Sequence, residues 1–269
     1  MADSPLLRMP PEIRLIIYEH LLDAGDSKVL NIRNRCLHPQ PKTNGDRRLR
    51  RTIYNSLEPM PGRRSCKTTY VLVDRREIAA ALLAVNRKIR SEASTLLYAK
   101  HCFHFDGDIE AAIHLLGDLS MPTRGLVQHI TLRKRSLATL HDGECPGWAH
   151  ACELLQTLPR LRTLSIVVEG GKPRAPWDGP TELSVSDLQL LYATRHEALH
   201  WVRALAGLDG LERLEISADL APLPMPRTSA TLIFAALSGS IETTLVEFLR
   251  SHLGLPAVAV PRAQSKIGM

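Results

Sequence analysis

The sequence predicts a protein of the α/β (α+β) class, with a helical N-terminal region followed by an irregular array of helices and strands around a short, largely parallel sheet. Three observations predict it. An amphipathic helix starts after two prolines, a second one covers residues 77–98, and an apolar nine-residue pattern recurs in the second half after helical segments. Because parallel strands need crossover connections, this order of elements favours a parallel sheet.

The first helix follows Pro10 and Pro11, and proline suits a first helical turn because its missing N–H would have no intrahelical partner there. Ile13, Ile16, Ile17 and Leu21 then fall on one helical face. This apolar stripe can bind a partner, or it can pack on the helix predicted at 77–98. The residues themselves leave both interpretations open.

Residues 31–69 are rich in Arg, Pro, Asn and Gly, which predicts a mobile surface excursion, with a short strand at 70–73. Between residues 28 and 76, 13 Lys and Arg side chains oppose three acidic ones, a net charge of +10 in a chain of +6. One interpretation is a solvated loop. The alternative is a nuclear or nucleic-acid-associated protein that uses the 28–76 segment to hold phosphates. Its candidate residues are Arg47, Arg48, Arg50, Arg51, Arg63 and Arg64.

The helix predicted at 77–98 rests on apolar residues spaced by three and four. They are Ile78, Leu82, Val85, Ile89, Ala93 and Leu96. A strand at 102–105 and a helix at 109–119 follow.

The recurring pattern L-x-x-L-x-x-L-x-I occupies residues 158–166 and 208–216, with a weaker copy at 127–132. Helical segments at 109–119, 148–158 and 188–205 precede the three copies, which are predicted to be strands. Residues 170–180 and 222–226 read as Pro/Gly connectors, and 241–253 as a last helix ended by Gly254. The tail, 255–269, is expected to be mobile.

Composition and motifs favour a non-enzymatic intracellular protein, cytoplasmic or nuclear, without a membrane partner. The five cysteines are scattered, with no Cys-x-x-Cys pair, which predicts reduced thiols. No run of about 20 apolar residues is present. Phosphate-loop, dinucleotide-binding, nucleophile-elbow and zinc-protease motifs are missing from the sequence, so no catalytic, cofactor-binding or metal-binding residue is expected. His101, Cys102 and His104 read as strand residues, not metal ligands.

Two blocks of the sequence form a combined motif. The first is residues 6–18, LLRMPPEIRLIIY, and the second is residues 81–98, ALLAVNRKIRSEASTLLY, followed by Phe103-His104-Phe105. Together they resemble fungal F-box-like proteins. Met9 and Asn86 depart from the family pattern, which has leucine and cysteine there. The recurring pattern is in turn similar to the strand of leucine-rich repeats, in a degenerate form. The resemblance implies an F-box-like region at 1–105 with a basic insertion at 31–69, and a repeat region at 106–254.

An F-box helix docks on a Skp1-type adaptor of a cullin ubiquitin ligase, while the rest of the protein binds a target. The resemblance therefore implies a protein-interaction module that recruits an unknown target protein. The residues that would face the adaptor are Leu6, Pro10, Ile13, Ile16 and Leu21.

Overall fold

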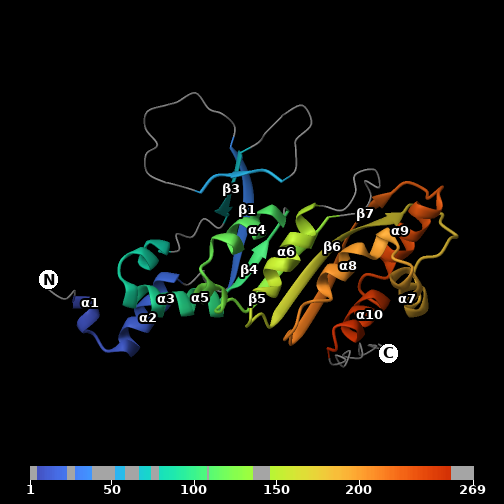
Figure 1. Cartoon of the computed structure of the whole chain (residues 1–269). Coiled ribbons are helices and arrows are strands. Elements are labelled where there is room, and N and C mark those ends of the chain that lie inside the picture. Colours follow the sequence, from blue (N-terminus) through green and yellow to red (C-terminus); the bar gives the residue numbers. More distant parts are fainter. Residues whose placement is uncertain are drawn as a thin grey trace, which may run out of the picture.

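The computed structural model describes residues 5–22, 28–37, 52–57, 67–73, 79–107, 109–135 and 146–255. One seven-stranded sheet runs through this part of the chain in the order β2-β3-β1-β4-β5-β6-β7 (Figure 1). Strands β1, β4, β5, β6 and β7 are parallel, and β3 pairs antiparallel with β1 and β2. The predicted α/β class with a largely parallel sheet is confirmed. The strands are β1 (Val29–Leu37), β2 (Tyr54–Asn55), β3 (Lys67–Leu72), β4 (Cys102–Phe105), β5 (His129–Lys134), β6 (Thr163–Pro173) and β7 (Arg213–Leu223).

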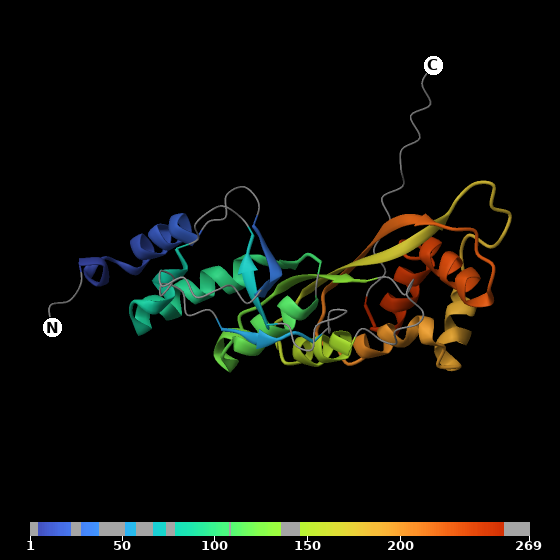
Figure 2. The same cartoon turned by 90° about the horizontal axis from the view of Figure 1, so that it is seen from above.

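Helices α4, α6 and α8 form a row along one face of the sheet, whereas α1 and α2 lie beyond its β3 end (Figures 1 and 2). The described residues form α1 (Pro5–Arg8), α2 (Pro11–Leu22), η1 (Ala80–Ala84), α3 (Arg87–Lys100), α4 (Ile109–Asp118), α5 (Met121–Arg124), α6 (Pro146–Gln156), α7 (Val185–Ala193), η2 (Glu197–Leu199), α8 (His200–Leu205), α9 (Ser229–Gly239) and α10 (Thr244–His252). No single described helix is long and apolar enough to cross a membrane, although α9 and α10 pass that test as a pair bent by 82°.

Two rows of side chains cross the five parallel strands and form the centre of the core. The recurring pattern predicts the members from β5, β6 and β7, because its equivalent positions come into register: Leu164 pairs with Leu214, and Ile166 with Ile216. The first row is Leu30, Phe103, Ile130, Leu164 and Leu214, and the second is Ile32, Phe105, Leu132, Ile166 and Ile216. All are buried except Ile216, which is half-buried. One sheet thus contains all four predicted strands, at 102–105, 127–132, 158–166 and 208–216. Strands β5, β6 and β7 begin a few residues later than predicted, at His129, Thr163 and Arg213.

The sheet also crosses the predicted boundary between residues 105 and 106. Strand β4 ends at Phe105 and pairs in parallel with β5, and the buried apolar side chains on both sides belong to one cluster. The 1–105 and 106–254 regions therefore share a sheet and a core.

The predictions at 31–69 and 77–98 need correction. Most of β1, all of β2 and half of β3 lie within 31–69. Alternate residues Leu30 and Ile32 of β1 face the core while this strand pairs with both β3 and β4. The long helix predicted at 77–98 is broken: η1 ends before Val85, which is 67% exposed, and Asn86 caps a new helix by accepting a hydrogen bond from the Lys88 N–H.

Corrections in the second half concern extent and number. Strands β6 and β7 continue to Pro173 and Leu223, through parts of the predicted connectors, because they pair with each other along their whole length. The segment 188–205 is split between α7 and α8 by Arg195, whose φ of 57° is incompatible with a right-handed helix. Helix α9 was not predicted. The last helix begins at Thr244 and, as predicted, ends before Gly254, which has a φ of +66°. The 256–269 tail lies outside the described residues.

Candidate protein-interaction surfaces

Helix α2 packs on α3 through a face that the sequence pattern did not single out. Its buried residues are Arg14, Tyr18 and Leu22, which are spaced by four. The Arg14 guanidinium donates from Nε to Glu92 Oε2 (3.0 Å) and from Nη2 to Glu92 Oε1 (2.6 Å), and from Nη1 to the Met9 carbonyl (2.6 Å). The hydrogen bond from Arg14 lowers the pKa of the Glu92 carboxyl. A bidentate ion pair therefore sets the orientation of α2 on α3.

The predicted adaptor residues lie on other parts of α1 and α2, and most face solvent. Ile13, Ile16 and Leu21 are 45%, 50% and 43% exposed, and Pro10 is exposed, whereas Leu6 is half-buried against the core. Ile17 of the same stripe is half-buried, and the Leu21 carbonyl accepts a hydrogen bond from the Ala79 N–H, so part of the stripe meets this segment while Ile13 and Ile16 remain about half exposed. We call the exposed set Pro10, Ile13, Ile16 and Leu21 the N-terminal apolar surface.

The six arginines of the predicted basic site lie outside the described residues, but the strand between them is well anchored. Glu110 of α4 is 2% exposed and accepts hydrogen bonds from Asn34 Nδ2 (2.6 Å), Ser56 Oγ (3.2 Å) and the Leu57 N–H (2.8 Å). The ring of Tyr54 stacks on His114, also of α4, at a centroid distance of 3.9 Å. Residues 52–57 are thus held to the sheet and α4 by a buried carboxylate and a stacked ring.

The face of the sheet opposite α4, α6 and α8 is polar and carries no described helix over β5, β6 and β7 (Figure 2). We call it the open sheet face. Across it, Thr131, Ser165 and Glu215 stand in register on neighbouring strands. Ser165 Oγ donates to Glu215 Oε2 at 2.9 Å. Side chains of this row are half-buried, so they are ordered by neighbours and still accessible to a partner.

Further along the strands, a chain of ion pairs crosses the open sheet face. Arg33 pairs with Asp106, which lies 3.4 Å from Arg133 Nε. Arg133 Nη1 donates to Asp219 Oδ2 at 2.6 Å and to Glu169 Oε1 at 3.2 Å. The hydrogen bond to Asp219 raises the pKa of Arg133, and the one from Arg33 lowers that of Asp106. Sequence analysis did not predict this row of ion pairs. The pattern that could have indicated it is the alternation along each strand, which places these charged residues on the face opposite the buried ones.

Two side chains close part of the edge of the sheet. Arg250 Nη2 donates to the Leu214 carbonyl at 3.0 Å, and Glu242 Oε1 accepts from the Ala218 N–H at 2.9 Å. Backbone groups of β7 that a further strand would need are therefore occupied at these positions. The open sheet face remains as the accessible side of the array.

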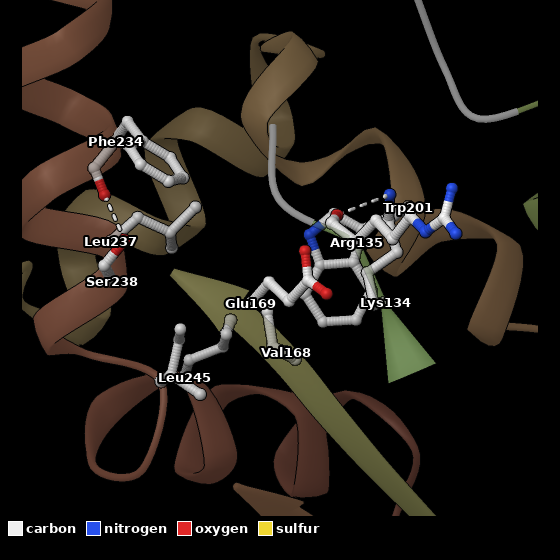
Figure 3. Close-up of a pocket in the computed structure, with 10 residues that line it drawn as sticks. Lys134, Arg135, Val168, Glu169, Trp201, Phe234, Leu237, Ser238 and Leu245 are labelled. Atoms are coloured by element: carbon white, nitrogen blue, oxygen red, sulfur yellow. Dashed lines mark hydrogen bonds between the residues drawn. The ribbon is translucent and has the colours of Figure 1, made fainter. Parts of the chain in front are cut away.

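Two cavities share the lining residues Glu169 and Phe234, and the larger one lies along the carboxyl ends of β6 and β7. One, of about 20 Å³, has room for a single water molecule and lies between β6 and helices α8, α9 and α10 (Figure 3). Its lining includes Val168, Glu169, Trp201, Phe234, Leu237 and Leu245. The other measures about 350 Å³ and is lined by Glu169, Gly170, Gly171, Asp219, Ala221, Pro222, Leu223 and Phe234. The larger cavity thus has carboxylates at one end and apolar walls.

The histidine and cysteine residues considered as ligands have local structural contacts. His101 is buried with Nδ1 3.1 Å from the Leu97 carbonyl, and Cys102 Sγ lies 3.4 Å from Thr131 Oγ1. Burial raises the pKa of the Cys152 thiol to about 12. Within the described ranges, no group of three or more His, Cys, Asp or Glu side chains is placed to hold a metal ion.

Comparison with known proteins identifies one family. The family described as "Domain of unknown function (DUF7730)" matches residues 1–191, a range that runs from α1 into α7 and includes strands β1 to β6. No curated protein and no solved structure matches the chain. The matched range covers most of the chain and continues past residue 105 without interruption, as the sheet does. The chain belongs to the DUF7730 family.

Proposed function

We propose that this protein is a non-enzymatic adaptor that docks on a Skp1-type subunit of a cullin ubiquitin ligase and presents a second surface to a target protein. The N-terminal apolar surface would contact the ligase subunit. The open sheet face would contact the target. Both roles start from the resemblance of residues 6–18 and 81–98 to F-box-like proteins.

One observation carries the proposal. Helix α2 satisfies its own packing on α3 with Arg14, Tyr18 and Leu22, and it leaves Ile13 and Ile16 about half exposed. A surface helix normally turns its apolar stripe toward its own core. A second apolar stripe that the core does not use is typical of a helix that docks into the groove of a partner.

The open sheet face supports the second role. A parallel sheet is usually covered on both faces, whereas here the face of β5, β6 and β7 that carries Thr131, Arg133 and Asp219 is polar and accessible. Solenoids use the accessible side of stacked strands in the same way, because each repeat adds a row of side chains to an extended binding surface.

The nucleic-acid hypothesis gains no support from the described residues, because its arginines lie outside them. It makes a separate prediction: binding to nucleic acid that weakens steeply with salt and is lost when Arg47, Arg48, Arg50 and Arg51 are replaced by alanine.

The test of the adaptor proposal is a pull-down of a purified Skp1-type subunit by the full chain and by an Ile13→Asp/Ile16→Asp variant. Both side chains are about half exposed, so the variant should keep its fold, which circular dichroism checks. If the proposal is right, binding falls by about 30-fold or more, as for interface hot spots.

A control replaces two apolar side chains that are more exposed than Ile13 and Ile16 and distant from α2. Met121 and Leu190 are 68% and 62% exposed, and a Met121→Asp/Leu190→Asp variant should bind like the wild type. Absence of binding by folded wild-type protein, also after deletion of residues 38–51, would exclude the adaptor role. Equal losses in both double variants would show that contact is unspecific.

A further inference from the structure

We propose that the larger cavity, at the carboxyl ends of β6 and β7, is a recognition pocket for an arginine side chain of the target protein. This inference rests on the proposed function, since it names the chemistry of the target that the open sheet face would bind. It concerns a different surface from the one that would contact the ligase subunit.

The position of the cavity suits a ligand. Strands β6 and β7 run side by side to Pro173 and Leu223, and the cavity of about 350 Å³ opens along their last residues. It is therefore continuous with the open sheet face.

The shape of the cavity is set by a close approach of α9 to β6. A Cβ atom on Gly171 would lie 2.8 Å from the Phe234 ring and 3.1 Å from a Leu223 methyl, and Ser238 Oγ accepts a hydrogen bond from the Gly171 N–H at 3.0 Å. The missing side chain lets Phe234 form a wall directly against the strand backbone. Ala221 and Leu223 complete an apolar channel.

The chemistry at the end of this channel favours a guanidinium. Asp219 and Glu169 already hold one guanidinium, that of Arg133, at 2.6 and 3.2 Å. The Asp219 side chain is 53% exposed, and Arg133 contacts it through Oδ2. Its second oxygen can therefore accept a donor that enters from the cavity.

An arginine side chain fits both parts of the cavity. Its three methylene groups would pack along Ala221, Leu223 and Phe234, while its planar head would meet Asp219 and Glu169 with hydrogen bonds assisted by charge. An acidic side chain would meet two carboxylates. A purely apolar one would remove water from the second oxygen of Asp219 without donating a hydrogen bond to it.

The test is an NMR titration of the full chain with two peptides, acetyl-Gly-Gly-Arg-Gly-Gly-amide and the same peptide with citrulline in place of arginine. Citrulline keeps the length and shape of the side chain and removes its charge. We expect saturable shifts of the Gly170 and Gly171 amide signals with the arginine peptide. The citrulline peptide should bind at least about tenfold more weakly.

Two variants locate the site. Glu169→Gln/Asp219→Asn removes both charges with little change of shape, and Ala221→Trp fills the channel while leaving both carboxylates in place; Ala221 is exposed, so this second variant should remain folded. Each should weaken binding of the arginine peptide about tenfold or more. A matched control, Asp209→Asn/Glu212→Gln, removes two charges at the opposite ends of the strands and should bind normally.

Equal binding of the two peptides, or unchanged binding by Ala221→Trp, would overturn the proposal. The result is independent of the ligase experiment: loss of the peptide site leaves the N-terminal apolar surface unchanged, and failure of the ligase subunit to bind leaves the peptide titration unchanged.

Discussion

Replacing Leu164 by alanine tests the row of side chains that joins the parallel strands. Leu164 is 0% exposed and stands in register between Ile130 and Leu214, which are 0% and 1% exposed. Because strands on both sides hold the backbone, the space left by the side chain cannot collapse fully. We expect a loss of about 3–4 kcal/mol in the free energy of unfolding, within the range known for buried leucines. With a urea m-value of about 2–3 kcal/mol/M, the midpoint falls by about 1–2 M.

The assay also tests whether residues 1–105 and 106–254 unfold together. All three tryptophans lie between residues 148 and 201, so their fluorescence reports the second region, whereas circular dichroism reports both. Phe103 is 5% exposed and lies in the same row, on the other side of residue 105. If the core is shared, Phe103→Ala lowers the midpoint seen by tryptophan fluorescence by an amount similar to Leu164→Ala.

The control is Leu220→Ala on β7, where the side chain is 42% exposed and the expected loss is below about 0.5 kcal/mol. The shared core would be refuted if Phe103→Ala kept the wild-type urea midpoint by tryptophan fluorescence while circular dichroism showed a transition at lower urea. A loss below about 1 kcal/mol for Leu164→Ala would refute the reasoning on the row itself.

Three further predictions follow from particular contacts. Because the hydrogen bond from Arg14 lowers the pKa of Glu92, the ion pair stabilises the fold above the unfolded-state pKa of this carboxyl, and that contribution is lost as the pH falls through the folded-state pKa. Between about pH 5 and pH 3 the urea midpoint should therefore fall more in the wild type than in Glu92→Gln, and parallel curves would contradict this. Gly171→Ala should lower the free energy of unfolding by about 1–3 kcal/mol because its Cβ would meet Phe234 at 2.8 Å, whereas Gly117→Ala, with open space around it, should leave that free energy unchanged or raise it by about 0.4–1 kcal/mol. Thermal melts compare the two variants, and equal effects would count against the close approach of α9 to β6. Burial raises the pKa of the Cys152 thiol to about 12, so this residue should resist iodoacetamide at about pH 8 until urea unfolds the chain. Mass spectrometry of the alkylated peptide measures this, and rapid labelling of the native protein would be inconsistent with its burial.

Periodicity along the chain was enough to predict the centre of the fold. The pattern at 158–166 and 208–216 placed Leu164 opposite Leu214, because equivalent apolar residues of neighbouring parallel strands face one core. The helices at 109–119 and 241–253 were predicted nearly at their observed positions, because their apolar residues recur every three or four positions. Each of these elements carries its signal in adjacent turns or alternate residues.

Strand β1 and the true packing face of α2 were not predictable in this way. Strand β1 is held by β4 and β3, which lie far along the chain, and its polar composition resembles a loop. The α2 face depends on Arg14, whose burial becomes favourable only because Glu92, 78 residues later, supplies a bidentate partner. A local pattern contains neither partner.

The spacing of apolar residues is enough to predict the α/β class, the apolar rows on β4 to β7 and the amphipathic N-terminal helix, because each of these depends on residues within one element. It does not predict that one sheet crosses residue 105, that Ile13 and Ile16 remain about half exposed, or that Arg133, Glu169 and Asp219 meet beside a cavity. The physical reason is that strand pairing and ion pairs join residues that are distant in sequence, and their geometry exists only after the chain has folded.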